Sequence, residues 1–552
     1  MIRHRAGPYL LLAAVAACTL FLRLGGLPFL GADEPRYARI AEEMNQAGNW
    51  VTPLLEGHPW LEKPPLYYWI TIPLYRAFGV SEAVARLGPA LCALAACVAV
   101  FQLGSRWWSR RAGLLGGCIL ATSVGFCAFG RSASPDMPLA ATFTVALALL
   151  ADAAVQGGLR AWNLWIAYAL LGLAVLAKGP AALILAAGII LMFWVVDERG
   201  GSLGALRVLP GLAICFLVSI PWFWLAFQEN GFSFISVFFV NHNLARYVSD
   251  LHHHEQPVYY FLPVLFGFLY PWSGWFPLLL PASLRTWIRN WRNWDRRTLF
   301  LACWALFPLL FFSLSTSKLP GYILPSMPPV ALLLGRRVCA RLRHHEAGKV
   351  WSVSLWMSLI VSAALAAAFP IVLQTQYAAG WQPGVYLAAV VLLPALLIFW
   401  MGCRGRMKPA VLTTVAQGVV LLLALTQIAF GPLAAHHSTR EIARLALADA
   451  AAGEPIVSYC FFHHTLRYYT GYRLGANIVD ARSLLEYARE HPDFLVVTES
   501  PRAQEIERMP ELSVTQLGVQ GKLRLLRIRN RESGVEISDY SRQKARLMAV
   551  RS

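Results

Sequence analysis

The chain has 552 residues, of which 57% are hydrophobic and only 14% are charged, and its mean hydropathy is +0.51. This composition excludes an ordinary soluble globular protein and indicates an integral membrane protein with many spans. The formal net charge of +18 is spread over separate loops and not over one compact basic domain, which argues against nucleic acid as a partner.

Long apolar runs predict a multi-span α-helical membrane protein with about thirteen transmembrane helices, because a helix needs roughly 17–25 mostly apolar residues to cross a bilayer. The first run follows Arg3 and Arg5 but ends without a convincing small-residue cleavage site, so we interpret it as a retained helix. The predicted segments are 8–25, 84–105, 113–130, 138–155, 163–178, 180–196, 208–227, 259–281, 298–315, 320–335, 351–374, 383–402 and 409–431.

Basic residues are shared unevenly between the loops that join these segments. Clusters of arginine and lysine occur at 106–111, 285–297, 336–349 and 404–408, whereas most alternate loops carry isolated cations. The positive-inside rule therefore predicts a cytoplasmic N-terminus. With an odd number of spans the C-terminal part is expected outside, which is the periplasm in a cell with two membranes.

The predicted membrane domain covers 1–431 and has external loops at 26–83, 130–137, 228–258 and 315–320, of which the first is too long to be a simple connector. Residues 432–552 predict a small periplasmic α/β domain, and their basic end beyond Glu532 is expected to be disordered. We expect strands at 454–459 and 494–498, helices at 440–450, 481–489 and 503–509, and a closing hairpin at 512–529.

The first external loop contains two adjacent carboxylates, Asp33 and Glu34, which are followed by Pro35. One interpretation is a helix start, with a carboxylate as N-cap and Pro35 in the first turn of an amphipathic helix over 37–46. The other is a catalytic carboxylate held where a membrane helix meets water. The two can coexist, and we favour Asp33 as the catalytic group and Glu34 with Pro35 as the helix start.

Cations in the apolar external loops are a second signal. Lys63, beside Glu62, either forms a weak ion pair at the rim or faces a lipid phosphate. Arg246 suits phosphate recognition, because its planar guanidinium group pairs with two oxygens at once. Lys318 either snorkels from the end of a span or lies with Tyr322 as a cation and a phenol at the membrane surface.

Two further patterns leave alternatives open. Asp136 either caps the helix that follows it or supplies a second carboxylate against positive charge at an anomeric carbon. Histidines at 252–254 could bind zinc with help from Glu62, and His242 is the other candidate ligand. No glycine-rich fingerprint for a nucleotide is present, so no nucleotide and no obligatory cofactor is expected.

Several motifs together resemble one known family. They are Asp-Glu-Pro-Arg-Tyr-Ala from Asp33, His-Pro-Trp-Leu-Glu-Lys-Pro-Pro-Leu-Tyr-Tyr-Trp from His58, Arg-Ser-Ala-Ser-Pro-Asp from Arg131, Ala-Lys-Gly-Pro from Ala177 and Ser-Lys-Leu-Pro-Gly-Tyr-Ile-Leu-Pro from Ser317. The chain looks like the bacterial undecaprenyl-phosphate 4-amino-4-deoxy-L-arabinose transferases that modify lipid A, which are relatives of the protein O-mannosyltransferases.

The resemblance implies a GT-C glycosyltransferase of the bacterial inner membrane, acting as a monomer. It implies transfer of the aminopentose from undecaprenyl phosphate to a lipid A phosphate, which gives resistance to polymyxin and cationic antimicrobial peptides. By the same resemblance Asp33 and Asp136 are the catalytic carboxylates, and Lys63, Arg246 and Tyr322 hold the leaving phosphate. The supporting residues are Glu34, Arg36, Tyr37, Tyr67, Lys178 and Lys318. Whether Glu62 and His242 bind a structural zinc ion is left open.

We also consider two other classes of protein. A protein O-mannosyltransferase-like enzyme would share the Asp-Glu motif but would need a base, because its acceptor is a hydroxyl group. A transporter of lipid-linked sugars would be expected to show internal repeats and charges in the middle of its spans, whereas most charges here lie at span ends and in external loops.

Overall fold

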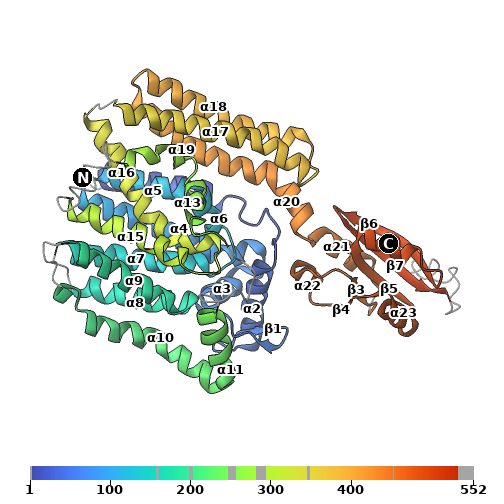
Figure 1. The fold of residues 1–552 in the computed structure, drawn as a ribbon. Coiled ribbons are helices and arrows are strands. Elements are labelled where there is room, and N and C mark those ends of the chain that lie inside the picture. Colours follow the sequence, from blue (N-terminus) through green and yellow to red (C-terminus); the bar gives the residue numbers. More distant parts are fainter. Residues whose placement is uncertain are drawn as a thin grey trace. The chain divides into compact units, whose positions relative to one another are not determined.

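A computed structural model describes residues 3–156, 161–197, 203–245, 256–280, 294–344, 348–451 and 453–531. The chain forms two compact units. The first comprises Met1–Leu27 and Tyr37–Pro432, and the second comprises Pro28–Arg36 and Leu433–Ser552. The first is almost entirely helical and the second contains a five-stranded sheet (Figure 1). A short piece of the first external loop, Pro28–Arg36, thus belongs to the C-terminal unit.

Most helices before the C-terminal unit follow the apolar runs of the sequence, whereas the helix that starts at Asp33 is rich in charged residues. In chain order they are α1 (Arg3–Ala16), α2 (Asp33–Ala47), α3 (Leu66–Phe78), α4 (Glu82–Trp107), α5 (Arg110–Thr122), α6 (Val124–Gly130), α7 (Asp136–Gln156), α8 (Ala161–Lys178), α9 (Ala181–Val196), α10 (Val208–Asn230), α11 (Phe232–Phe234), α13 (Phe261–Phe268), α15 (Arg296–Ser313), α16 (Met327–His344), α17 (Lys349–Thr375), α18 (Trp381–Cys403), α19 (Met407–Ala424) and α20 (Phe430–His437).

Within the described ranges, seven helical segments are long and apolar enough to cross a membrane, or up to nine if each of two bent helix pairs is one span. The bent pairs are α5 with α6, at 68°, and α13 with the 3₁₀ turn Trp272–Leu279, at 117°. Three shorter apolar helices, Ala6–Phe21, Trp162–Lys178 and Ala181–Val196, also coincide with predicted segments. These helices confirm a multi-span membrane protein.

The predicted segment 320–335 is different from the others. Its first part, Pro320–Ser326, is a 3₁₀ turn, and α16 starts only at Met327 and ends among basic residues. Pro320 and Pro325 lack a backbone N–H, so an α-helical ladder of hydrogen bonds cannot run through this stretch. Gly321 fits it closely, because a Cβ atom there would lie 2.8 Å from the ring of Phe129.

Small residues let the helices of the first unit approach one another closely. At Gly113 of α5 a Cβ atom would lie 2.3 Å from the carbonyl oxygen of Phe101 in α4. Such close approach compensates for the weak hydrophobic driving force between helices in lipid. Figure 1 shows α17, α18 and α19 running side by side, and α18 contacts both of the others.

The first external loop contains more regular structure than its sequence predicts. The predicted helix over 37–46 is present as α2, which begins four residues earlier, at Asp33, so that both carboxylates lie in its first turn. A short hairpin of β1 (Leu54–Leu55) and β2 (His58–Pro59) follows, and then α3, neither of which the sequence indicated.

Within the predicted external loop 228–258, the residues up to Ala245 are helical, which the sequence did not indicate. After α10 comes α11, and a π-helical stretch covers Ile235–Ala245. The cause is an aromatic cluster, in which the buried Phe234 contacts Trp222 edge to face at 5.6 Å and stacks on Phe238 at 5.6 Å. Arg246 and the histidines at 252–254 lie outside the described residues.

The second unit is an α/β fold whose sheet has the strand order β4-β3-β5-β7-β6. The predicted strands, helices and closing hairpin are confirmed, whereas β4 and α22 were not predicted. Its elements are α21 (Arg440–Asp449), β3 (Ile456–Tyr459), α22 (His464–Tyr469), β4 (Leu474–Ile478), α23 (Ala481–Glu490), β5 (Asp493–Glu499), α24 (Ser500–Glu507), β6 (Leu512–Gln520) and β7 (Leu523–Asn530). Strand β3 pairs in parallel with β4 and β5, and β7 pairs antiparallel with β5 and β6. The end beyond Glu532 lies outside the described residues.

Candidate active site

The first unit contains a cavity of about 420 Å³, built from segments that lie far apart in the sequence. Most of its walls are apolar, and a few charged and aromatic groups lie among them. The lining residues are Glu62, Lys63, Leu139, Lys178, Pro180, Ala181, Ile184, Leu185, Phe239, His242, Phe311, Phe312, Ser315, Gly321, Tyr322 and Pro325.

Lys178 lies at the centre of one charged group in this cavity. It is the last residue of α8, because Gly179 adopts a positive φ of 101° and Pro180 then starts the turn into α9. Its ammonium group pairs with Asp136, the first residue of α7, and lies 5.0 Å from the centroid of the Tyr322 ring. Asp136 therefore begins its helix as predicted and also neutralises a cation at the cavity.

Lys63 and Glu62 enter the cavity from the loop after β2. The Lys63 side chain is only 8% exposed, and its Nζ atom lies 3.4 Å from the carbonyl oxygen of Glu62. The Oε1 atom of Glu62 lies 3.7 Å from Nε2 of His242. The structure thus brings together five residues predicted for the site and places Asp136 beside them; the five are Glu62, Lys63, Lys178, His242 and Tyr322.

Glu62 and His242 supply only part of the ligand set that a metal ion needs. Glu62 and His242 are close enough to share a cation after small movements of their side chains, but zinc sites in proteins use three or four ligands. Over the described ranges, no group of three or more histidine, cysteine, aspartate or glutamate side chains could hold a metal ion. The predicted contribution of the histidines at 252–254 lies outside those ranges.

Asp33 belongs to the second unit. Its side chain is 65% exposed, and its Oδ1 atom accepts a hydrogen bond from Nη2 of Arg36 at 2.5 Å. Arg36 also donates from Nε to the carbonyl oxygen of Ala32 at 3.0 Å. Glu34 is buried instead and accepts from the N–H of Leu30 at 3.3 Å. The two adjacent carboxylates thus have different surroundings, because Glu34 is buried and Asp33 is exposed.

The segment that carries Asp33 is attached to α22. Phe29 is fully buried, its N–H donates to the hydroxyl group of Tyr469 at 2.7 Å, and its ring meets that of Tyr468 edge to face at 5.0 Å. The N–H of Gly31 donates to the carbonyl oxygen of His437 at 3.4 Å. These contacts are the signal that sequence reasoning missed, since they join residues about 440 positions apart.

The other predicted supporting residues have structural partners. Tyr37 and Tyr67 are buried with their ring centroids 6.1 Å apart, and the Tyr67 hydroxyl group donates to the carbonyl oxygen of Ala85 at 3.0 Å. Lys318 is buried and donates to the carbonyl oxygen of Ser315 at 2.5 Å. It lines a second, more open cavity of about 500 Å³, to which Ser315 also contributes.

The chemistry of the first cavity suits one end of a lipid-linked phosphate. Leu139, Ile184 and Phe311 provide apolar wall and Lys63 provides positive charge, while the charge of Lys178 is balanced by Asp136. A cation in such surroundings interacts with an anion far more strongly than it would in water. Sequence reasoning missed the apolar wall residues, because within a span they are indistinguishable from residues that face lipid.

Comparison with known proteins agrees with this chemistry. A family model, dolichyl-phosphate-mannose-protein mannosyltransferase, matches residues 29–237. An undecaprenyl phosphate-alpha-4-amino-4-deoxy-L-arabinose arabinosyl transferase of Pseudomonas paraeruginosa is 33% identical over 60% of this chain and 60% of its own length. One of Serratia proteamaculans is 33% identical over 59% and 58%. The chain spans about three fifths of the length of these curated relatives.

Solved structures extend the similarity to almost the whole chain. ArnT from Cupriavidus metallidurans, in the apo state, has a TM-score of 0.76 and 25% sequence identity. The same protein bound to undecaprenyl phosphate has a TM-score of 0.75 and 26% identity, and each comparison covers 95% of this chain and 98% of the other. The chain therefore has the GT-C membrane fold of the ArnT structures, and about three fifths of it is related in sequence to the aminoarabinose transferases, while residues 29–237 match the mannosyltransferase family model.

Proposed function

We propose that the protein is an integral membrane glycosyltransferase that moves 4-amino-4-deoxy-L-arabinose from undecaprenyl phosphate to a phosphate of lipid A. The observation that carries this proposal is the apolar cavity in which Lys63 and the Lys178–Asp136 pair meet. The printed activity of the curated relatives and the undecaprenyl phosphate bound to ArnT support the choice of donor.

The proposed reaction is an inverting substitution at the anomeric carbon. An oxygen of the acceptor phosphate forms the new bond to this carbon, and the bond to the undecaprenyl phosphate oxygen breaks with its electron pair going to that oxygen. The acceptor is already anionic near neutral pH, so no strong general base is required. The barrier lies in positive charge on the sugar ring, which a fixed carboxylate stabilises, and in negative charge on the leaving phosphate, which cations stabilise.

In this proposal Asp33 and Asp136 are the carboxylates, and Lys63, Tyr322 and Arg246 hold the leaving phosphate. Lys178 assists by orienting Asp136, with which it pairs. No nucleotide or obligatory metal takes part. A zinc ion at Glu62 and His242 would be structural, and elemental analysis of the purified protein before and after Glu62→Gln tests for it: an ion lost in the variant supports it, and a metal-free wild type rejects it.

The proposed location is the bacterial inner membrane, with about thirteen spans, a cytoplasmic N-terminus and the C-terminal unit in the periplasm. Arginine and lysine clusters in alternate predicted loops support this orientation. Acting as a monomer there, the enzyme would reduce the negative charge of lipid A and so give resistance to polymyxin and cationic antimicrobial peptides.

A second candidate is a transferase with a hydroxyl acceptor, which the match of residues 29–237 to the mannosyltransferase family model favours. Mass spectrometry of lipid A from cells with and without the gene separates the two. A mass increase of one aminopentose that depends on the gene, and that Lys63→Ala or Asp33→Ala removes at equal protein level, supports the proposal. If lipid A is unchanged and a glycoprotein appears only in cells with the gene, the result favours a transferase with a hydroxyl acceptor.

A further inference from the structure

The turn of the β1–β2 hairpin has an unfavourable backbone conformation. Glu56 has a φ of +55° and Gly57 a φ of +77°. Two positive φ angles are typical of the type I′ turns that join two-residue hairpins. Glycine adopts such angles freely, but at Glu56 the side chain makes the conformation costly. Something must therefore stabilise this turn.

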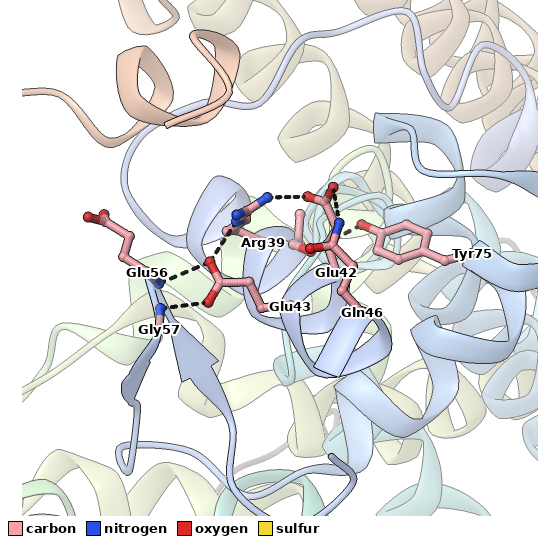
Figure 2. Close-up of polar contacts among 8 residues, drawn as sticks. Arg39, Glu42, Glu43, Gln46, Glu56, Gly57 and Tyr75 are labelled. Atoms are coloured by element: carbon pink, nitrogen blue, oxygen red, sulfur yellow. Dashed lines mark hydrogen bonds and ion pairs between the residues drawn. The ribbon is translucent and has the colours of Figure 1, made fainter. Parts of the chain in front are cut away.

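One carboxylate satisfies both N–H groups of the turn. Oε1 of Glu43 accepts a hydrogen bond from the N–H of Glu56 at 3.0 Å, and Oε2 accepts from the N–H of Gly57 at 3.0 Å. Figure 2 shows Glu43 between α2 and the turn, with the Glu56 side chain pointing away from it. Consecutive backbone N–H groups of this kind form an anion-binding site, and here the anion is a side chain of the protein itself.

Arg39 holds Glu43 from the other side. Its Nε donates to Oε1 of Glu43 at 2.6 Å, and its Nη1 donates to Glu42 at 3.1 Å (Figure 2). Glu43 is only 8% exposed, so it cannot exchange these partners for water without moving. Hydrogen bonds that involve charged groups are stronger than those between neutral groups.

The hairpin leads directly to the cavity. After β2 the N–H of Trp60 donates to the carbonyl oxygen of Pro53 at 2.8 Å, which closes the base of the hairpin. Two residues before β1, Thr52 bonds to Glu229 and also accepts a hydrogen bond from the side-chain amide of Asn230 at 2.7 Å. Lys63 follows, buried at the cavity. Its place thus depends on how the hairpin is held.

We propose that Glu43, held by Arg39, is a positioning residue for Lys63: it fixes the strained turn of the hairpin and so sets where the Lys63 ammonium group meets a phosphate. The inference rests on the proposed function in one respect, namely that a polyprenyl phosphate is the ligand of this cavity. Removing the carboxylate takes away the two hydrogen bonds that Glu43 accepts from the turn, and with them the compensation for the strain at Glu56.

The test measures the affinity of the purified full chain for undecaprenyl phosphate. Glu43→Gln keeps the shape of the side chain but cannot accept both hydrogen bonds and loses its charge for Arg39, so we expect binding about tenfold weaker. Glu42→Gln is the matched control. It lies on the same helix and also loses a bond to Arg39, but it has no bond to the turn, and its affinity should stay within about twofold of wild type.

A second substitution shows whether the effect travels through the turn. In the Glu43→Gln background, Glu56→Gly removes the strain, because glycine adopts a positive φ readily. We expect this double variant to regain part of the lost affinity, which a general loss of stability would not predict. Equal binding by the two glutamine variants, or no recovery in the double variant, would overturn the proposal.

Sugar transfer is measured on the same samples. If wild type binds undecaprenyl phosphate but transfers no aminopentose, the proposed function fails while the binding data still decide the role of Glu43. If wild type does not bind undecaprenyl phosphate, both the phosphate role of Lys63 and the positioning role of Glu43 are rejected.

Discussion

The two ends of the first external loop are supported in different ways. The end with Lys63 belongs to the first unit, where the chain before it is fixed by Glu43 of α2 and by Thr52 against α10, and Lys63 itself is buried. The end with Asp33 belongs to the second unit, where Phe29 is fixed on α22 while Asp33 remains exposed. The Lys63 side chain is thus held in place by its burial, whereas the Asp33 side chain is open to solvent. The C-terminal unit therefore supports the Asp33 end of the loop.

The largest expected effect is on sugar transfer, and it distinguishes a residue that binds undecaprenyl phosphate from one that acts only in the transfer step. Lys63→Met and Asp33→Asn should each lower the transfer rate by at least about a hundredfold, because in the proposed reaction each removes a charge that stabilises opposite charge developing in the transition state. Only Lys63→Met should also weaken binding of undecaprenyl phosphate. Transfer and binding assays on purified protein check both, with Lys408→Met, an exposed lysine at the start of α19, as the control. A loss of lipid binding in Asp33→Asn would remove the distinction between the two ends.

The next effect concerns stability at the cavity. Asp136→Asn leaves Lys178 without its counter-charge in surroundings that are only 20% exposed. Removing one partner of a buried pair costs several kcal/mol, and because this pair is only partly buried we expect a smaller loss, about 2 kcal/mol, in the free energy of unfolding. The double variant Asp136→Asn/Lys178→Met should be more stable than Asp136→Asn. Thermal unfolding in detergent measures the order, and a single variant as stable as wild type would show that the pair is well solvated.

A smaller effect tests the support of the Asp33 end. Tyr469→Phe removes the hydrogen bond to the Phe29 N–H, which is worth about 1 kcal/mol. Hydrogen exchange in Pro28–Arg36 should become faster, and the transfer rate should fall while the affinity for undecaprenyl phosphate stays the same. Tyr459→Phe is the control, since it also loses a hydroxyl hydrogen bond, to Glu505 at 3.0 Å, elsewhere in the second unit. Equal exchange rates in the two variants would contradict the role of α22.

The smallest effect is a pH dependence of the second unit. Burial and the nearby Arg36 lower the pKa of His464 to about 4, from an ordinary value of 6.5, although Asp33 acts in the opposite direction. Between these values the unfolded chain binds a proton that the folded unit does not, so stability falls as the pH drops from about 6.5 towards 4.

Burial also lowers the pKa of His463 and of His437 in the same unit. Pulse proteolysis in urea at pH 7.5 and pH 5 measures this loss. His464→Gln should reduce the difference between the two pH values, and an unchanged difference would assign the effect to the other two histidines.

Much of the fold could be predicted from the sequence because its elements depend on local composition. Apolar runs and turn residues were enough to locate twelve of the thirteen predicted segments on apolar helices or bent helix pairs, including the reversal at Gly179 and Pro180. The predicted hairpin 512–529 also has its turn at Gly521, where φ is +56°. Two differences from the predicted segments also have local causes. Prolines break the segment 320–335. Aromatic packing accompanies the helical residues 232–245 that follow α10 in the predicted loop.

The candidate site was predicted in part for a different reason. Charged residues are costly in an apolar chain, so Lys63, Asp136 and Lys178 could be selected without knowledge of their neighbours. Their pairing could not be predicted, because α7 and α8 are apolar all round and a sequence pattern does not show which face of such a helix is turned towards which neighbour. Arg39 and Glu43 had the spacing of an ordinary surface ion pair, and only the hairpin reveals their further bonds.

The sequence alone thus determined the class of protein, the course of its helices, the α/β character of its C-terminal unit and the residue types available for phosphate chemistry. These properties follow from hydropathy and from short-range backbone preferences, which act within a few residues. Only the tertiary structure decided that Lys178 joins Asp136 and Tyr322, that Lys63 is buried beside them, and that Asp33 is carried by the C-terminal unit. Those arrangements depend on side-chain packing between segments far apart in the chain. Local sequence periodicity does not show which of these segments pack together.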